Sequence, residues 1–521
     1  MIKSEFEFDE NQTFLQVIIK KCTLFGSRPA FIDAETKEII TFEYLLHKAK
    51  KLSNIFGEIG IRKGDIVAIC VENNIYYPII FVACLYSGII LNCINNKSTL
   101  YELEHLLGMS KPRLIFSSES TYEMIKLIRE KLTFIKSQIN VTKRVDCISL
   151  MELLELNILE EAQPEDIDPM EHVAVIMNSS GTTGLPKAVQ ITHDNLKYII
   201  GYVGSSKFIE LNSNDVGISI CPFYHLYGFI VFVSTLLTGT LSVVMSKFRR
   251  ERYLELIETY HVTKLWLVPP IAIFLAKSPL VDNYKLDCLK SIICGAAALG
   301  IEIKNMVSKR LNVTVQQVFG MTELSGIVAI MPIVSIEELG GCIGKLCPGV
   351  IGMIKDVETD EILGPYQNGE ICFKGNFVMK GYLNNAAANA SILDDDKVLR
   401  TGDIGYYDEN GYFFVMDRMK ELIKYKAYQV SPTELEDIIN SHDCIADCAV
   451  IGKPDENSGE LAMALIVTKS NFHINEQQII DYVAKHVSID KQLHGGVIFV
   501  DEIPKSASGK ILRKELKKYI I

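Results

Sequence analysis

Hydroxyl, glycine and lysine residues gather between two short apolar segments, residues 173–177 and 188–191. Glycine lets the backbone turn close to a ligand, while hydroxyls, free N–H groups and an ammonium hold phosphate oxygens. The pattern predicts a strand, a loop and a second strand, with a nucleoside triphosphate bound by the loop. The residues expected to bind it are Ser179, Ser180, Gly181, Thr182, Thr183, Gly184 and Lys187. A polar hairpin turn is the alternative, and the Pro186-Lys187 pair argues against it.

This loop does not fit the Walker P-loop, in which Gly-Lys-Ser/Thr opens a helix; here Pro186 precedes Lys187 and a β-branched run follows. The segment resembles instead the signature loop of the adenylate-forming superfamily, which includes acyl-CoA synthetases, coumarate-CoA ligases, insect luciferases and peptide-synthetase adenylation domains. Residues 178–186 are most similar to the luciferase branch. Ala188 stands where the family usually has glycine, and one added methyl predicts only a small adjustment.

A histidine lies in the aromatic run 221–228. Taken alone, such a histidine is more often a core residue than a functional one. The run is similar to the superfamily's Pro-Phe-His-His motif, and this resemblance implies that His225 borders the substrate carboxylate and that Tyr227 lines its pocket. Three further residues are expected to line the same apolar pocket: Met321, Gly326 and Ile327. Fatty and aromatic acids fit such a pocket about equally.

Small residues follow the predicted strand that ends near Ile293, where a flat ring can lie against the backbone at the carboxyl end of a strand. We expect Gly295, Ala296 and Ala297 to form the adenine-side wall, with helix capping as the alternative. Ala298 replaces the family's proline, which removes rigidity but no functional group.

The run 317–323 is a second motif of the superfamily, with Phe319 in place of the usual tyrosine. Phenylalanine keeps the ring that stacks on adenine and loses only a hydroxyl. Thr322 is expected to bond the reacting phosphate, and Glu323 is an oxygen ligand suited to the Mg²⁺ carried by ATP. Gln317 and Gly320 complete the expected nucleotide-binding set.

Charged residues in the last third of the chain complete the predicted site. Asp403, after a glycine, is expected to accept hydrogen bonds from both ribose hydroxyls. The resemblance adds Arg418 to the nucleotide site and makes Lys420 the hinge of a mobile lid. It also gives catalytic roles to Lys424 and to Lys510, the family's adenylation lysine. Ala427 replaces a family glycine beside the expected pantetheine passage and predicts a slow coenzyme A step.

The length and composition of the chain exclude several classes of protein. A chain of 521 residues predicts about three folding units at roughly 150 residues each. Its net charge of −11 argues against nucleic acid as a partner. The 13 cysteines include no Cys-x-x-Cys pair, which favours a reduced intracellular protein without a structural metal. We expect a cytoplasmic monomer, because the N-terminus lacks an apolar signal core and the C-terminus lacks a Ser-Lys-Leu-like address; a peroxisomal location is the alternative.

The alternation of helical and strand patterns predicts an α/β fold. We expect a large N-terminal domain, residues 1–417, with two helix-covered, mostly parallel sheets and a small β-rich subdomain. Residues 418–521 are expected to form a small, mobile α+β lid. Two long uncharged runs, 73–96 and 216–246, are interrupted by polar residues and read as buried helix-strand pairs, not membrane spans.

The motifs together predict an ATP-dependent carboxylate-CoA ligase, with ATP, Mg²⁺ and coenzyme A as cofactors and a small carboxylic acid as substrate. Three other functions stay open. A luciferase-like monooxygenase forms the same adenylate and oxidises it, a carrier-protein loader needs a phosphopantetheine partner, and a pseudoenzyme only binds nucleotide.

Overall fold

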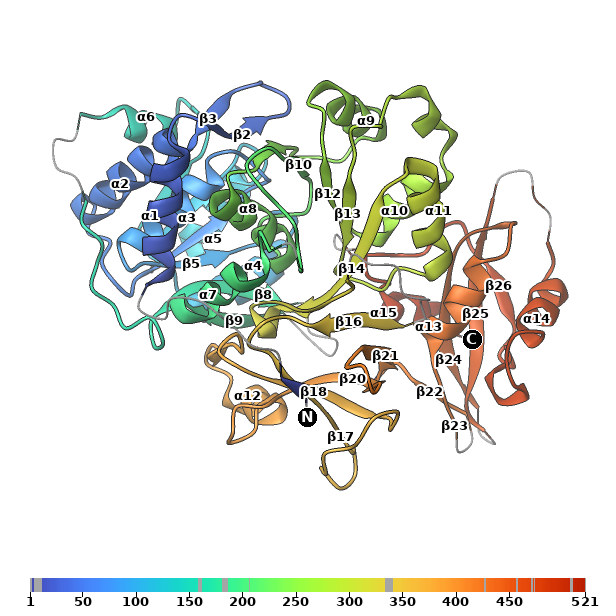
Figure 1. The fold of residues 1–521 in the computed structure, drawn as a ribbon. Coiled ribbons are helices and arrows are strands. Elements are labelled where there is room, and N and C mark those ends of the chain that lie inside the picture. Colours follow the sequence, from blue (N-terminus) through green and yellow to red (C-terminus); the bar gives the residue numbers. More distant parts are fainter. Residues whose placement is uncertain are drawn as a thin grey trace.

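The computed structural model describes residues 2–3, 12–157, 162–179, 186–205, 207–332, 341–425, 428–455, 458–469, 472, 474–506 and 509–520. Within these residues it forms an α/β core and a smaller C-terminal unit (Figure 1). The predicted fold class is confirmed.

The first sheet of the core has seven strands, including the two that flank the predicted phosphate loop. Its strands, in spatial order, are β19 (Gly381–Tyr382), β9 (Lys187–Thr192), β8 (Val173–Ser179), β5 (Ile90–Cys93), β4 (Ile66–Cys70), β6 (Leu114–Ser117) and β7 (Ser137–Asn140). From β8 to β7 all neighbours are parallel, whereas β9 runs antiparallel to both β8 and β19. The predicted strand, loop and strand are therefore β8, the segment after it, and β9.

The second sheet is longer than predicted, because the β-rich subdomain continues it. Its order is β1 (Ile2–Lys3), β17 (Ile351–Lys355), β18 (Gly369–Lys374), β20 (Leu399–Tyr407), β21 (Phe413–Arg418), β16 (Cys342–Leu346), β15 (Gly326–Ile330), β14 (Thr314–Met321), β13 (Ser291–Cys294), β12 (Lys264–Leu267), β10 (Val216–Ser219), β11 (Leu241–Val244), β2 (Pro29–Asp33) and β3 (Ile39–Thr41). The strands from β14 to β2 are parallel, and the subdomain strands are antiparallel. A continuous series of hydrogen-bonded strands thus connects β13, which precedes the expected adenine wall, with β21, the last strand of the core.

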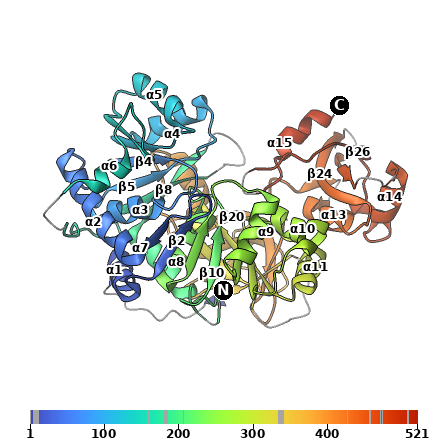
Figure 2. The ribbon, with the colours of Figure 1, turned by 90° about the horizontal axis from the view of Figure 1, so that it is seen from above.

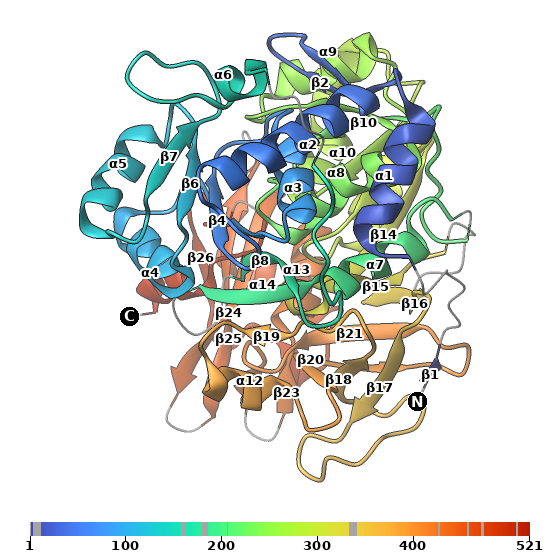
Figure 3. The same cartoon turned by 90° about the vertical axis from the view of Figure 1, so that its left-hand side faces the viewer.

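Helices cover both sheets. Those of the core are α1 (Phe14–Phe25), α2 (Phe42–Glu58), α3 (Tyr77–Tyr86), α4 (Leu100–Ser110), α5 (Tyr122–Lys131), α6 (Leu150–Glu155), α7 (His193–Tyr202), α8 (Leu226–Thr238), α9 (Arg250–Thr259), α10 (Pro269–Lys277), α11 (Ile301–Leu311) and α12 (Ala386–Ile392). Two of them, α3 and α8, are apolar all round and pack together, with the Phe81 and Phe229 rings 5.0 Å apart. Figures 2 and 3 show these helices among the strands of the two sheets.

The C-terminal unit, called the lid below, lies beside the parallel part of the second sheet, next to α10 and α11 (Figure 2). Its strands are β22 (Ile423–Tyr425), β23 (Tyr428–Val430), β24 (Ile445–Asp455), β25 (Gly459–Thr468) and β26 (Val497–Phe499), and its helices are α13 (Pro432–Asn440), α14 (Glu476–Ala484) and α15 (Arg513–Leu516). Strand β21 ends at Arg418, and β22 already belongs to the lid sheet.

Local signals explain where several elements begin. The Thr41 side chain caps α2, and Thr192 with Asn195 forms a capping box that opens α7. Ser431 and Glu434 have the spacing of a capping box at the start of α13, but only half of the box is present. Ser431 caps the helix, but the Glu434 carboxylate binds the Lys491 ammonium at 2.7 Å instead of turning back.

The two long uncharged runs are folded as predicted. Residues 73–96 form α3 and β5, and residues 216–246 form β10, α8 and β11. Among the described residues, no helix is both long and apolar enough to cross a bilayer.

Candidate active site

The described strand ends place much of the predicted site at one junction of core and lid. Ser179 ends β8 and Lys187 begins β9. Residues 180–184 of the predicted phosphate loop lie outside the described residues. The Ser179 hydroxyl is buried and has no hydrogen-bond partner among the residues described.

Lys510 reaches this junction from the lid. Nearby protein atoms and the Arg418 charge lower the pKa of its ammonium, while Asp403, Glu323 and Glu421 act in the opposite direction. The predicted adenylation lysine, ribose ligand and metal ligand therefore share one electrostatic environment.

Gly509 explains how the lid loop fits against the core. Its φ of +83° is in the left-handed region, and a Cβ built there would lie 2.8 Å from Cδ of Pro270, at the start of α10. The same turn is closed by hydrogen bonds from the Gly509 amide to the Ser506 carbonyl and from the Ser506 amide to the Lys510 carbonyl. Glycine is thus required both by the turn and by the close approach of the two units.

Asp403 lies on β20 directly opposite Arg418 on β21, and the Arg418 Nε is 3.2 Å from the Asp403 carboxylate. Asp403 is only 4% exposed. Burial raises the pKa of its carboxyl to about 6, against the lowering effects of Arg418 and Lys510. The 3.2 Å contact with Arg418 uses one of the two carboxylate oxygens.

Glu323 is buried beside a residue that sequence reasoning did not single out for the site. The Tyr382 hydroxyl donates a hydrogen bond to the Glu323 carboxylate at 2.8 Å, and burial next to this carboxylate raises the Tyr382 pKa. The Lys187 ammonium lies over the Tyr382 ring, 4.8 Å from its centroid. Tyr382 reaches Glu323 through the pairing of the two-residue strand β19 with β9, which no local sequence signal reveals.

His225 precedes α8 and is half-buried. Burial, and secondarily the charge of Lys510, lowers the pKa of its ring to about 4, so the imidazole is neutral at pH 7. Two residues further, the Tyr227 hydroxyl donates to the Ile293 carbonyl at 2.9 Å. Both predicted residues therefore lie at the N-terminal end of α8, and only Tyr227 is fixed by a hydrogen bond to the sheet.

The predicted adenine wall follows β13. A Cβ on Gly295 would lie 2.8 Å from the Val318 side chain and 3.0 Å from the Tyr227 ring, so the close packing requires glycine. Ala296 has a φ of 70°, a left-handed conformation that costs a non-glycine residue roughly 1 kcal/mol. Such strain is typical of functional loops. Ala297 follows it and is half-buried.

The second motif ends β14 and turns into a short 3₁₀ segment, Thr322–Leu324. At Gly320 the register with β15 shifts, and a Cβ would lie 2.2 Å from the Gly326 carbonyl oxygen. Half-buried residues flank this glycine, namely Gln317, Phe319, Met321 and Thr322.

Some predicted residues are not joined to this cluster. Lys420 is exposed in the connection between β21 and β22, and Lys424 is exposed on β22. Ala427 lies outside the described residues. Ile327 is 3% exposed, and its carbonyl accepts a hydrogen bond from Tyr198 at 2.9 Å. Gly326 packs against the same helix, α7, with the Tyr202 hydroxyl 3.0 Å from a Cβ built on it.

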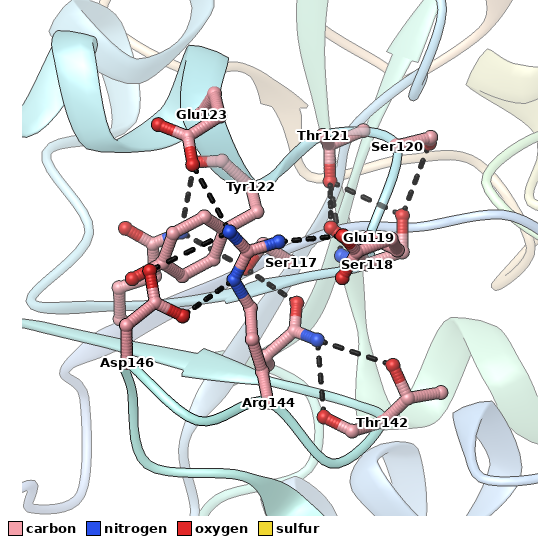
Figure 4. A network of polar contacts seen from close by, with 12 residues as sticks. Ser117, Ser118, Glu119, Ser120, Thr121, Tyr122, Glu123, Thr142, Arg144 and Asp146 are labelled. Atoms are coloured by element: carbon pink, nitrogen blue, oxygen red, sulfur yellow. Dashed lines mark hydrogen bonds and ion pairs between the residues drawn. The ribbon is translucent and has the colours of Figure 1, made fainter.

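A second cluster of charges lies far from these strand ends, at the edge of the first sheet (Figure 4). The Arg144 guanidinium binds the carboxylates of Asp146, Glu119 and Glu123, at 2.7, 2.6 and 3.1 Å. It also lies over the Tyr122 ring, 4.0 Å from the centroid. We call these residues the Arg144 cluster.

Lys510 of the C-terminal unit and the buried Glu323 and Asp403 of the core therefore lie together, as the resemblance to the adenylate-forming superfamily implies. Residues 20–383 match the family model described as "AMP-binding enzyme", and residues 434–510 match the "AMP-binding enzyme C-terminal domain". The chain belongs to this family, whose members are acid-thiol ligases and related enzymes, and the predicted recognition is confirmed.

Individual relatives cover nearly the whole chain. It is 36% identical over 499 residues to a luciferin 4-monooxygenase of Photuris pensylvanica, covering 94% of this chain and 91% of that protein. It is 35% identical over 525 residues to a probable 4-coumarate-CoA ligase 1 of Dictyostelium discoideum, covering 97% and 94%. The solved structure of ATP-bound MatB from Rhodopseudomonas palustris aligns with a TM-score of 0.87 at 25% identity, covering 98% of this chain and 99% of that one.

Proposed function

We propose that this enzyme joins a fatty or aromatic carboxylic acid to coenzyme A in two steps, through an acyl-adenylate made from ATP. The observation that carries the proposal is the position of Lys510, which the lid brings into the same electrostatic environment as Glu323 and Asp403. The curated relatives include ligases that are named for this reaction on other acids.

In the first step a carboxylate oxygen of the acid attacks the α-phosphorus of ATP, and the bond to the pyrophosphate oxygen breaks. Negative charge is redistributed over the phosphate oxygens, so catalysis consists mainly of positioning and charge neutralisation. We assign that neutralisation to Lys510. His225 is neutral at pH 7, because its pKa is lowered to about 4, and so borders the acid without adding a competing charge.

The residues fit the nucleotide. The unpartnered Ser179 hydroxyl is suited to a phosphate oxygen, and the buried Asp403 carboxylate to the ribose hydroxyls. Magnesium supplies charge neutralisation at the phosphates when it is bound with ATP. The described residues contain no group of three or more His, Cys, Asp or Glu side chains that could hold a metal alone. Glu323 is therefore assigned as one protein ligand of a metal that arrives with ATP.

In the second step the coenzyme A thiolate attacks the acyl carbon of the mixed anhydride, forming the thioester as AMP leaves. By resemblance the lid rotates about Lys420 between the steps and presents Lys424, which explains why Lys424 is away from the cluster while Lys510 is docked.

Ala427 is expected to slow the coenzyme A step, because a methyl group replaces a glycine at the lid edge. The variant Ala427→Gly should transfer the acyl group to coenzyme A faster and leave adenylate formation unchanged. Quenched-flow measurement of the two half-reactions decides this. Equal transfer rates for the wild type and the variant would show that the methyl group is tolerated.

A luciferase-like monooxygenase is the second candidate, favoured by the 36% identity to the Photuris enzyme. Both candidates form an adenylate and differ in its fate. Light emission with luciferin, ATP and oxygen supports the monooxygenase, whereas thioester formation across a panel of carboxylic acids supports the ligase.

We place the enzyme in the cytoplasm, to be tested by imaging an N-terminally tagged chain; co-localisation with peroxisomes would contradict this.

The decisive experiment is ATP-pyrophosphate exchange, followed by thioester detection, with the same acids. Exchange and thioester formation with at least one acid are expected. An enzyme that binds ATP but exchanges no pyrophosphate with any acid of the panel would contradict the proposal and favour a nucleotide-binding pseudoenzyme.

A further inference from the structure

Residues 376–383 return from the β-rich subdomain to the first sheet, and their backbone is bonded to two of the predicted motifs. The Met379 amide donates a hydrogen bond to the Glu323 carbonyl at 3.0 Å. The Leu383 amide donates to the Ala188 carbonyl of β9 at 2.8 Å. One segment therefore connects the turn that holds the expected metal ligand with the strand that follows the phosphate loop.

Tyr382 lies in the middle of this connection, and its backbone is fixed from two sides. As part of β19 it pairs with Val189 of β9. On the other side, the Tyr382 amide donates to the Asn389 side-chain oxygen at 2.6 Å, and the Asn389 side-chain amide donates back to the Tyr382 carbonyl at 3.1 Å. These bonds leave the tyrosine side chain one direction, toward the interior, where it is 5% exposed.

Two different parts of the Tyr382 side chain contact two charged groups. Its hydroxyl donates to Oε1 of Glu323 at 2.8 Å, and the Glu323 residue is 7% exposed. The face of its ring lies under the Lys187 ammonium, 4.8 Å from the ring centroid. Lys187 is two residues from Val189, the strand partner of Tyr382, so strand alternation places it on the same side of β9.

Both contacts restrict side chains that would otherwise have several orientations. Carboxylates that bind a metal are commonly held by a hydrogen-bond donor behind them, and loss of that donor weakens metal binding. A lysine has a long flexible stem, and an aromatic face attracts its ammonium to one place. Glu323 is assigned to the metal that arrives with ATP and Lys187 to the phosphates. Tyr382 therefore holds two groups that bind different parts of one ligand.

We propose that Tyr382 is a positioning residue with two separable contributions: its hydroxyl orients Glu323 toward the metal, and its ring orients Lys187 toward the phosphates of ATP. This inference rests on the proposed function, in which Glu323 and Lys187 bind ATP together with Mg²⁺. Tyr382 acts through these two side chains, so removal of the hydroxyl and removal of the ring should have different effects.

The test compares the affinity for ATP with and without Mg²⁺, measured by calorimetry on the full chain. We call the ratio of the two dissociation constants the Mg²⁺ coupling. Tyr382→Phe removes the hydroxyl and keeps the ring, so it should lower the Mg²⁺ coupling by about tenfold and leave the metal-free affinity within about twofold of the wild type. Tyr382→Leu also removes the ring, so it should weaken metal-free binding of ATP several-fold as well.

Two further measurements separate positioning from a general loss of structure. In a Glu323→Gln background, Tyr382→Phe should lower the Mg²⁺ coupling no further, because the hydroxyl then has no carboxylate to orient. In pyrophosphate exchange, Tyr382→Phe should need about tenfold more Mg²⁺ to reach half of its maximal rate, and excess Mg²⁺ should restore that rate.

Tyr76→Phe is the matched control. The Tyr76 hydroxyl donates to Oε1 of Glu38 at 2.6 Å, next to β3 at the far end of the second sheet. This variant loses the same kind of hydrogen bond and should keep the wild-type Mg²⁺ coupling. If Tyr382→Leu unfolds, Lys187→Met replaces it, because that variant removes the same contact between ammonium and ring from the other side.

An unchanged Mg²⁺ coupling in Tyr382→Phe overturns the role of the hydroxyl. Equal losses of affinity with and without Mg²⁺ in that variant mark a tyrosine that serves only the fold, and overturn the proposal as well. Metal-free binding that is as tight in Tyr382→Leu as in Tyr382→Phe overturns the role of the ring. A wild type that exchanges no pyrophosphate with any acid overturns the proposed function, whereas the calorimetric comparison still decides the role of Tyr382.

Discussion

Two arginine-carboxylate clusters in this enzyme have opposite designs. In the Arg144 cluster one guanidinium meets three carboxylates that are each at least half exposed, at 50 to 73% (Figure 4). At the junction of core and lid, Arg418 meets a single aspartate that is 4% exposed, and Lys510 adds a second positive charge from another unit.

The difference in exposure distinguishes a cluster that only stabilises the local fold from one that is suited to bind a ligand. Exposed ion pairs are screened by water and contribute little beyond local order. At the junction, Lys510 and Arg418 instead meet three carboxylates, those of Asp403, Glu323 and Glu421, and two of these, Asp403 and Glu323, are buried. Charges from two units that meet around buried carboxylates, and not the number of exposed ion pairs, distinguish the candidate active site.

Removing the lysine that the lid contributes should have the largest effect. Lys510→Ala is expected to lower the rate of adenylate formation by on the order of 10²-fold or more. Thioester formation from supplied acyl-adenylate should change far less, as separate assays of the half-reactions would show. Lys505→Ala is the matched control, because Lys505 lies in the same loop but pairs with Asp447 of the lid at 2.7 Å. Equal losses in both half-reactions would mean that Lys510 serves both steps or only the fold.

Displacing this lysine should have a smaller effect than removing it. Gly509→Ala places a methyl group against Pro270 and strains a residue with a φ of +83°. A cost of about 1.4 kcal/mol to the docked lid corresponds to a roughly tenfold slower adenylation. Gly60→Ala controls for backbone strain, since Gly60 has a φ of +80° and nothing within 4 Å of the added atom. If both variants adenylate like the wild type, the lid contact at Pro270 is not limiting.

Titrating the buried aspartate should weaken nucleotide binding at low pH. The Asp403 pKa is raised from 3.8 to about 6, so the carboxylate is protonated below pH 6 and ATP affinity should fall several-fold by pH 5. The free energy of unfolding changes with pH in the opposite direction to the ATP affinity. The raised Asp403 pKa stabilises the fold below pH 3.8, and this contribution is lost as the pH rises through about 6. Calorimetric ATP binding across this range, with Asp403→Asn as a pH-independent reference, checks the affinity. A pH-independent wild type would remove Asp403 from the ribose site.

Dismantling the Arg144 cluster should have the smallest effect. Arg144→Met keeps an aliphatic stem over Tyr122 and removes the three ion pairs. We expect an unchanged adenylation rate and only a small fall in melting temperature, measured by thermal denaturation. An altered adenylation rate would show that the first sheet's edge is coupled to the active site.

Local sequence signals predicted the elements well where a single segment decides the outcome. Thr41 caps α2 and Thr192 caps α7 because each cap needs only residues three positions away. Ser431 shows the limit. The expected partner, Glu434, binds Lys491, and Asp417 accepts bonds from the Ser431 hydroxyl and the Thr433 amide. Residues distant in sequence thus compete with the local pattern.

The site residues also fall into two groups, those that local motifs predict and those that only the folded structure reveals. Motif resemblance led to His225, Glu323, Asp403 and Lys510, whose clustering depends on chain order that the family shares. Tyr382 was missed as a partner of Glu323, because only the pairing of β19 with β9 brings it there.

Asp417 links the core to the lid by side-chain hydrogen bonds. It lies on the last core strand, yet its carboxylate accepts hydrogen bonds from the Ser431 hydroxyl at 2.6 Å and the Thr433 amide at 3.1 Å, both in the first turn of the lid helix α13. In the proposed rotation of the lid about Lys420, these two bonds break before the lysine loop leaves. The Thr433 amide is then free to exchange with solvent deuterium, so its exchange rate is a measure of the proposed rotation.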